Sequence, residues 1–432
     1  MILRTLPAIA ALLALTAFPA AAQEDAEPRL TLDEVVARAL RTSPTVAQSS
    51  GAVRSAESAE RSALGAFLPS LSLSTGASLA STERFNPTTN TTVSGSSDSY
   101  SAGLNSSVAL FTAGRRGAEL RRTRAQTASA EATLTLQEFN VALVAKQTFF
   151  AVLRGDETLA VAESQLARAE QSLEAAERRI SVGSATTSDR LRSQLELNQA
   201  KQAVLRARTE RRTAAFELGR LVGADGPVGA QADARLEPRP LSVSDAELEL
   251  LVVAAAPSVE AAEATFRANE AGVRVARTQY FPTINLSGGY DWFNQEAAFD
   301  GGRTSWSTRL SLSYPIFNGF QREDAIERAS VQARTARYQL EDARRAARSQ
   351  LQSALATLEL ARQQIELAEE AVAVAREDLR VQQERYRLGV ATMLDQLTSQ
   401  TALAQAENDL VAARYDYQIA RAQVETLVGR EL

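Results

Sequence analysis

The chain has 432 residues, with 47 Lys and Arg against 52 Asp and Glu, a formal net charge of −5, no Cys and no His. A mildly acidic chain has no electrostatic footprint for nucleic acid, so we expect no nucleic-acid partner. Without Cys and His it lacks disulfides, thiol nucleophiles and the commonest general base and metal ligand. Because it also has no phosphate-binding Gly loop, we expect no enzyme, no metal and no cofactor.

Residues 1–22 have the pattern of a secretory signal peptide. Arg4 precedes an apolar run, and the small residues Ala20, Ala21 and Ala22 follow it, which predicts cleavage after Ala22. Beyond this segment no apolar run approaches the roughly 18 residues of a membrane-spanning helix. If the exported chain enters a membrane, we expect it to do so by strands.

The rest of the chain contains one structural unit twice, at 23–223 and 245–432. "FLPSLSLS" in the first copy corresponds to "FPTINLS" in the second, "ALFTAGRR" corresponds to "PIFNGFQR", and each copy ends near "LVG". Self-similarity over this length indicates a duplicated fold unit. The Gly- and Pro-rich segment between the copies predicts a linker at 224–244.

Each copy begins with a helical segment followed by a β-hairpin. The helical segments, Leu30–Ala66 and Asp245–Tyr280, are each interrupted by a Pro that suits the first turn of a new helix. The hairpins, at about 70–111 and 283–317, alternate apolar residues with small polar ones, as in "LSLSTGASLA". Period two over about ten residues is typical of transmembrane β-strands. One such hairpin would favour a half-buried soluble pair, but two matched hairpins in an exported chain favour the membrane.

A long Pro-free helix, a turn and a return helix complete each copy. The long helices are predicted at about 113–181 and 320–387, and the return helices at about 187–222 and 393–428. At a rise of about 1.5 Å per residue, each long helix spans roughly 100 Å. Large apolar residues recur at every seventh position, with Ala three positions on, which predicts coiled-coil seams with close helix approach.

The number of strands predicts an assembly. Four strands cannot close a barrel, and an open sheet edge in lipid would leave backbone groups without partners. Two copies would give an eight-stranded barrel filled by its own side chains, whereas the small polar inner faces favour the wider lumen of three copies. We therefore predict an α+β membrane protein whose four transmembrane β-strands per chain contribute to a trimeric twelve-stranded β-barrel. A long α-helical coiled-coil barrel continues it away from the membrane.

The turn between the long and return helices is nearly the same in both copies, "RISVGSATTSDRL" and "RYRLGVATMLDQL". Gly183 and Gly389 suit the left-handed conformation that ends a helix. The Thr-x-x-Asp after each Gly predicts a capping box at the start of each return helix: Thr186 with Asp189, and Thr392 with Asp395. This structural interpretation alone accounts for the Gly, Thr and Asp.

The order and duplication of these segments, with "LFTAGRR" and "IFNGFQR" after the hairpins and "VGSATTSD" and "LGVATMLD" at the turns, resemble the TolC-like outer membrane efflux protein (outer membrane factor) family. The similarity covers essentially the whole chain after the signal. It implies a homotrimeric channel-tunnel in the outer membrane lipid of a Gram-negative bacterium, extending into the periplasm. It also implies the exit duct of a tripartite efflux or type I secretion system. The partners would be a periplasmic adaptor (membrane fusion) protein and an inner membrane RND or ABC transporter.

The resemblance also implies roles for the turns, which would be periplasmic tips that narrow the pore. Asp189 corresponds to a tip Asp that pairs with a Tyr of the neighbouring long helix, and Tyr386 corresponds to that Tyr. Asp395 corresponds to an acidic residue of the pore constriction. Ala391 stands where the best-known member has a tip Arg, and Thr398 where it has a second pore Asp. The adaptor-docking residues would be those of both turns: Gly183, Ser184, Ala185, Thr186, Gly389, Val390, Ala391 and Thr392.

A periplasmic coiled-coil adaptor or scaffold protein is the alternative. It would explain the heptads but not two lipid-faced hairpins, because such adaptors usually carry one coiled-coil hairpin beside β-rich domains.

Overall fold

The structure is a computed structural model that describes residues 27–88, 90–232, 243 and 245–432. The predicted signal peptide, and residues 233–242 and 244 of the predicted linker, lie outside the described residues. Within the described part, a unit of helices, hairpin, long helix and return helix occurs twice along the chain.

The helices of the two copies correspond in order and length. In the first copy they are α1 (Leu32–Thr42), α2 (Pro44–Gly65), α3 (Arg115–Ser181) and α4 (Thr187–Val222). In the second copy they are α5 (Asp245–Ala255), α6 (Pro257–Arg277), α7 (Gln321–Arg387) and α8 (Met393–Val428), with a 3-10 turn at Thr278–Tyr280. The long helices have 67 residues each and the return helices 36 each, so the duplication extends to matched helix lengths. Among the described helices, none combines the length and apolarity needed to cross a bilayer.

Each copy contributes one hairpin to a four-stranded antiparallel sheet of order β2–β3–β5–β6. The strands are β2 (Ser70–Asn86), β3 (Thr91–Phe111), β5 (Thr283–Asn294) and β6 (Arg303–Ser313). β6 ends at Ser313 rather than near residue 317 because Pro315 has no backbone N–H to continue the ladder.

The two faces of the sheet differ in chemistry. On one face, cross-strand neighbours are large and apolar, as in the pair Tyr290 and Trp306, and Trp306 is 77% exposed. On the other face they are small or polar, as in the pair Gly289 and Ser307. A continuous row of exposed large apolar side chains marks a surface that lipid or another protein covers.

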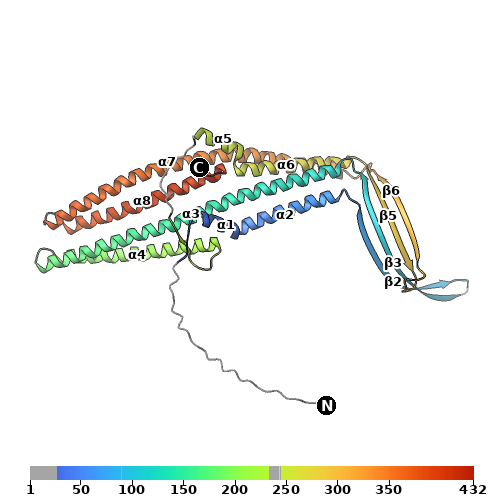
Figure 1. Ribbon diagram of the computed structural model, residues 1–432, viewed down its shortest axis with the longest axis horizontal. Helices are drawn as coiled ribbons and strands as arrows, with labels where there is room; N and C mark the ends of the chain where they lie inside the picture. Colours follow the sequence, from blue (N-terminus) through green and yellow to red (C-terminus); the bar gives the residue numbers. More distant parts are fainter. Residues whose placement is uncertain (1–26, 89, 233–242, 244) are drawn as a thin grey trace, which may run out of the picture.

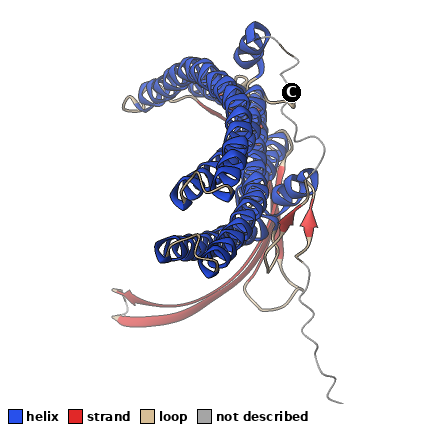
Figure 2. Ribbon diagram, turned by 90° about the vertical axis from the view of Figure 1, so that its left-hand side faces the viewer, coloured by secondary structure: helices blue, strands red, loops and turns tan. Residues whose placement is uncertain are grey.

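The helices form a single curved layer with the sheet at one end. α3 packs against α4 and α8, and α8 packs against α7; nearer the sheet, α3 lies between α2 and α6, and α6 packs against α7. Both helical hairpin tips lie at the end opposite the strands (Figure 1). The view along the helices shows an open arc and not a closed bundle (Figure 2). The layer therefore ends in α2 and α4 at one edge and in α7 at the other.

Within each helical hairpin the seam follows the predicted heptads. The residues of α7 that recur every seventh position are all buried: Leu351, Leu358, Ile365, Val372, Leu379 and Tyr386. They meet small buried residues of α8 such as Ala406 and Ala413, which allows the two helix backbones to approach closely.

The first part of the predicted linker is structured. β1 (Arg29–Leu30) pairs in parallel with β4 (Gly229–Ala230), which lies inside 224–244. The Gln231 N–H donates to the Leu30 carbonyl at 2.9 Å, and Val228 is buried in the core that α1, α3 and α4 share. The segment after α4 thus also fixes the start of the chain's described part against the helical layer.

The junction between β6 and α7 is held by an Arg in the first turn of the long helix. Arg322 donates hydrogen bonds to the carbonyls of Pro315 at 3.0 Å and Ile316 at 3.3 Å. Its guanidinium lies 4.9 Å from the centroid of the Tyr280 ring, which precedes the hairpin. The Arg322 side chain is nearly buried, so the two carbonyls serve as its hydrogen-bond partners in place of water.

A related arrangement occurs in the first copy, where the carbonyl acceptor lies before the hairpin and not after it. Arg116 donates to the Ala66 carbonyl at 3.3 Å and lies 5.0 Å from the Phe67 ring centroid. The Arg that closes "FTAGRR" and "FNGFQR" therefore ties each hairpin base to the helices on either side of it.

We expect Arg322→Ala to lower the unfolding free energy by about 2 kcal/mol, because two carbonyls lose a charged donor. Arg328→Ala is the matched control: Arg328 lies on the same helix, is 71% exposed and forms a surface ion pair with Asp324. Its loss should cost less than about 0.5 kcal/mol. Thermal unfolding followed by circular dichroism measures both, and equal effects of the two substitutions would contradict the role of Arg322.

The paired hairpin tips as the candidate functional site

Both tips turn on a Gly in the left-handed conformation, as predicted. The φ angle is +73° at Gly183 and +78° at Gly389. The first turn closes through a hydrogen bond from the Ser184 N–H to the Arg179 carbonyl at 2.8 Å, and the equivalent bond closes the second tip at 2.9 Å. Because a Cβ would strain this conformation, each Gly fixes the point where a long helix ends.

Both predicted capping boxes are confirmed. The Thr186 hydroxyl accepts from the Asp189 N–H at 3.3 Å, while the Asp189 carboxylate accepts from the Thr186 N–H at 2.9 Å and from its hydroxyl at 2.8 Å. For Thr392 and Asp395 the same three distances are 3.3, 2.8 and 2.7 Å. Each return helix therefore begins with its first backbone donors satisfied by its own side chains.

The second capping box also sets the charge of Asp395. Hydrogen bonds from the Thr392 side chain and backbone hold the pKa of this carboxyl below its ordinary value of 3.8. Asp395 is exposed at the tip. The group is thus a surface anion at neutral pH, positioned by the turn itself.

Tyr386 meets Arg179 of the other hairpin. The guanidinium carbon of Arg179 lies 4.3 Å from the centroid of the Tyr386 ring, and Arg179 donates a hydrogen bond to the Tyr386 carbonyl. Tyr386 is 8% exposed and packs on Ala176, Met393 and Leu397. Burial raises the pKa of the Tyr386 phenol, so the ring stays neutral.

The Asp189 carboxylate bonds to Thr186 and not to Tyr386. The Tyr386 hydroxyl has no hydrogen-bond partner among the described residues, although the charge of Asp189 is near enough to help raise the pKa of Tyr386. The predicted pair is not formed within the described chain, and it stays a prediction for the assembled tips. Arg179 was missed as a site residue, although the sequence repeats it as Arg385 at the same place in the second turn.

The rim of the tips is more apolar than the small-residue prediction implied. Of the eight residues predicted to dock an adaptor, all but the two Ala are exposed. One of the eight, Val390, is a large apolar side chain that is 64% exposed, and beside them lie Val182 at 76% and Leu388 at 69%. Small residues at the turn and an apolar rim around it together form a surface suited to another helical hairpin.

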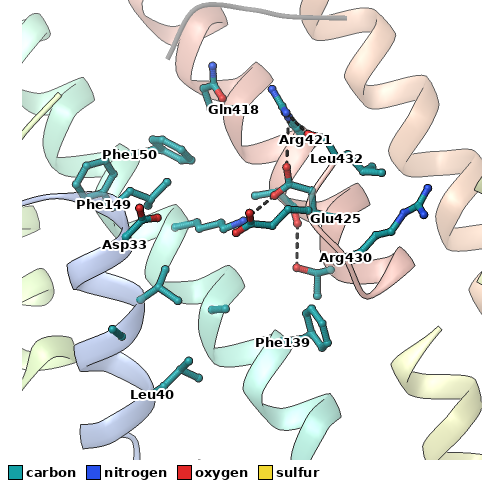
Figure 3. Close-up of a pocket in the computed structure, with 18 of the residues that line it drawn as sticks. Asp33, Leu40, Phe139, Phe149, Phe150, Gln418, Arg421, Glu425, Arg430 and Leu432 are labelled. Carbon is teal, nitrogen blue, oxygen red and sulfur yellow. Dashed lines mark hydrogen bonds and ion pairs between the residues drawn. The ribbon is translucent and has the colours of Figure 1, made fainter. Parts of the chain in front are cut away.

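A second candidate site is a cavity of about 430 Å³ between α1, α3 and α8 (Figure 3). Its walls include Phe139, Phe149 and Phe150, and its polar side holds a half-buried ion pair of Lys146 with Glu425 at 2.6 Å. Arg421 lies 3.3 Å from the same carboxylate. Lys146 and Arg421 both pair with Glu425, and the cavity lies between helices of the two repeats.

The comparisons with known proteins agree with this geometry. The chain matches the family described as "Outer membrane efflux protein" over residues 35–224 and 251–430, one match in each repeat. Because these matches cover most of the chain, the protein belongs to the outer membrane efflux protein family. This confirms the resemblance in the sequence and places the protein in the outer membrane.

Several relatives share part of the chain. Protein CyaE of Bordetella pertussis is 31% identical over 252 residues, which cover 55% of this chain and 51% of CyaE. Alkaline protease secretion protein AprF of Pseudomonas aeruginosa is 25% identical over 294 residues, covering 66% of this chain and 60% of AprF. The chain therefore matches about half to three-fifths of the length of these relatives.

Solved structures share the fold over nearly the whole chain. The outer membrane protein VceC of Vibrio cholerae has a TM-score of 0.76 at 19% identity, covering 93% of this chain and 96% of VceC. A membrane protein from Pseudomonas aeruginosa has a TM-score of 0.80 at 22% identity, covering 94% and 91%. At these identities the likeness establishes the fold alone.

We expect the stability contributed by Asp395 to disappear in acid. Because its folded pKa lies below 3.8, the contribution is present above that value and is lost as the pH falls through the lower folded pKa. The difference in melting temperature between the wild type and Asp395→Ala should stay constant from neutral pH to about pH 4 and then shrink. Thr392→Ala removes the hydroxyl that donates to the Asp395 carboxylate, so its difference in melting temperature from the wild type should also shrink below about pH 4. A difference that grows in acid would contradict this assignment.

Proposed function

We propose that the protein is a homotrimeric channel-tunnel of the outer membrane and the exit duct of a tripartite efflux or type I secretion system. Three copies would close a twelve-stranded β-barrel in the membrane, and their helices would continue it as a tunnel through the periplasm. The observation that carries the proposal is that the curved layer has two open edges that match each other, β2 and α4 on one side and β6 and α7 on the other.

The sheet offers one free strand at each edge. Within the described residues β2 pairs only with β3, and β6 only with β5. A free strand edge in lipid leaves N–H and C=O groups unsatisfied, which costs several kcal/mol per group. Pairing of β6 of one copy with β2 of the next would satisfy both edges by the same contact, and a head-to-tail contact of this kind forms a ring when its rotation closes after a whole number of copies.

The helical edges carry matching apolar stripes. On α7 four exposed residues recur every seventh position, beside the seam that faces α8: Leu360, Leu367, Val374 and Val381. On α4 one exposed stripe lies opposite the seam that faces α3: Leu191, Leu195, Leu205 and Phe216. Stripes at heptad spacing are the pattern of a coiled-coil seam, and each of these stripes lacks a partner within the part of the chain that the structure describes. The α7 stripe of one copy would pack on the α4 stripe of the next.

The proposed partners follow from the position of the tips. Both tips lie at the end opposite the strands, so with the sheet in the membrane they would point into the periplasm (Figure 1). There they would meet the helical hairpins of a periplasmic adaptor, and through it an inner membrane RND or ABC transporter. The name of AprF refers to alkaline protease secretion, and that of OpmQ of Pseudomonas aeruginosa, 28% identical over 291 residues, to pyoverdine export.

The pore role of the tips belongs to the same proposal. Asp395 and its two copies would form an anionic ring at the periplasmic opening, with Asp189 and Tyr386 beside it. Gly183–Thr186 and Gly389–Thr392 would contact the adaptor. The adaptor-type alternative explains the heptads, but it gives no use for the exposed apolar row on the sheet.

We expect the double substitution Leu367→Glu and Val374→Glu to abolish the trimer, because two charges would be buried at each joint between copies. Native mass spectrometry of the detergent-extracted protein measures the oligomer. Ala373→Glu is the matched control: Ala373 is exposed next to Val374 but on another side of α7, so the trimer should persist. A stable trimer of the double variant would exclude the proposed helical joint.

We expect Asp395→Asn to reduce the cation preference of the channel, since it removes the charge but keeps a side-chain oxygen for the capping box. The reversal potential in planar bilayers under a salt gradient is the measurement. Glu366→Gln, a neutralised exposed acid in mid-helix, should leave the preference unchanged. An unchanged reversal potential for Asp395→Asn would show that Asp395 does not line the pore.

A further inference from the structure

We propose that Arg179 is a positioning residue of the tip: with Tyr386 it forms a latch that holds the two helical hairpins of one chain together. The contact lies within one chain, whereas its effect on passage rests on the function proposed above. The latch is defined as the Arg179 guanidinium together with the ring and carbonyl of Tyr386.

Arg179 crosses from the first hairpin to the second. Its guanidinium carbon lies 4.3 Å from the centroid of the Tyr386 ring, and one of its nitrogens donates to the Tyr386 carbonyl. The other terminal nitrogen donates to the Ser184 carbonyl of its own turn at 3.4 Å. One half-buried side chain thus joins the last turn of α7 to the turn that follows α3.

The position explains why the residue is a cation. α3 ends at Ser181 and α7 ends at Arg387, and both run from the sheet towards the tips, so their carbonyl ends lie at the same end of the molecule (Figure 1). The carbonyl end of a helix carries partial negative charge. A guanidinium between the two ends is attracted to both and offsets their mutual repulsion.

The ring of Tyr386, and not its hydroxyl, is the receiving part. The ring is held by Ala176, Met393 and Leu397, while the hydroxyl is buried without a hydrogen-bond partner among the described residues. A planar guanidinium can stack on a ring and donate sideways to a carbonyl at the same time, which the compact ammonium of Lys cannot do.

In a ring of copies, helical hairpins would meet either inside one chain or between two neighbouring copies. The differences between the two repeats restrict the latch to the joint inside one chain. At the equivalent places of the other repeat stand Arg385 and Ile180. Arg385 is exposed and bonds to Gln382 at 3.5 Å on its own helix, and Ile180 offers no ring. In a ring of copies, the joints inside each chain would therefore be latched and the joints between copies would not.

The first test is the conductance of the trimer in planar lipid bilayers. Arg179→Ala and Tyr386→Leu each remove the stacked pair, and we expect the ratio of closed to open time to fall roughly tenfold, which corresponds to about 1.4 kcal/mol. Arg179→Lys should resemble Arg179→Ala, because charge alone does not restore the stack. Arg178→Ala is the matched control: the neighbouring Arg178 is 75% exposed, and its ion pair within the described chain is with Glu174 on its own helix.

Tyr386→Phe separates the latch from a pair between Asp189 and the Tyr386 hydroxyl. The latch needs the ring, so Tyr386→Phe should keep the wild-type ratio of closed to open time. If Tyr386→Phe instead opens the channel as far as Arg179→Ala does, the hydroxyl holds the tip and the latch is overturned.

The second test measures the distance between the hairpins without using conductance. The chain has no Cys, so spin labels can be placed cleanly by Val182→Cys and Leu388→Cys, both at exposed positions. Labelled chains diluted into unlabelled ones report the distance within one chain. We expect a narrow distribution in the wild type and a broad one after Arg179→Ala. A distance distribution that Arg179→Ala leaves unchanged would overturn the latch, even if the wild type conducts. A wild type that does not conduct would overturn the proposed function, but this distance measurement would still test the latch.

Discussion

A layer one helix thick cannot bury its own edges, and this constraint governs the molecule. Among the described elements, each helix between the edges packs against neighbours on two sides, but α4 and α7 have their main neighbours on one side, and β2 and β6 each pair with one strand. The chain keeps an apolar stripe or a free strand at each of these edges. Burial of such surfaces contributes about 25 cal/mol per Å². Each of the two edges of the open arc in Figure 2 is therefore one half of an interface. This is the physical reason for proposing a ring of copies.

Two kinds of contact hold the layer together, and they differ in how they can move. Inside each helical hairpin, large residues interdigitate with Ala over many turns, and separating them would expose a continuous apolar surface. Between the hairpins, near the tips, α3 meets α8 through the small apolar cluster around Ala176 and through polar groups: Ser172 accepts from Gln400 at 2.8 Å, and Arg168 pairs with Glu407 at 3.1 Å. Water can replace such partners at a small net cost. The hairpins are thus rigid units joined by contacts that can be exchanged, and this makes a single well-placed latch at the tip important.

Much of this could be predicted from the sequence because the signals are local. Gly183 and Gly389 ended the long helices, the Thr and Asp three residues apart started the return helices, and period two marked the strands. What escaped prediction depends on chain segments far apart. Arg179 meets Tyr386 across 207 positions, and a repeat shows which residues are equivalent but not which are neighbours. β1 and β4 have two residues each, too few for any period to appear. The edge stripes of α4 and α7 were hidden for another reason: an apolar residue at heptad spacing looks the same whether its partner lies in the same chain or in another copy.

The two copies of the turn share the residues that backbone conformation and helix capping require. They differ at the positions whose side chains contact different neighbours. Gly, Thr and Asp keep the same places in both turns because left-handed φ and helix capping are needed wherever a long helix reverses. Tyr386 and Ile180 differ because the two positions face different surroundings, the first an Arg of the same chain. A ring of identical repeats would have identical joints and no preferred place to separate. In the proposed ring, one joint would be latched inside each chain and the other would be held by apolar stripes between copies. The two kinds of joint would then differ in strength and in chemistry, so movement of the tips would be concentrated at one kind of joint and not spread evenly around the mouth.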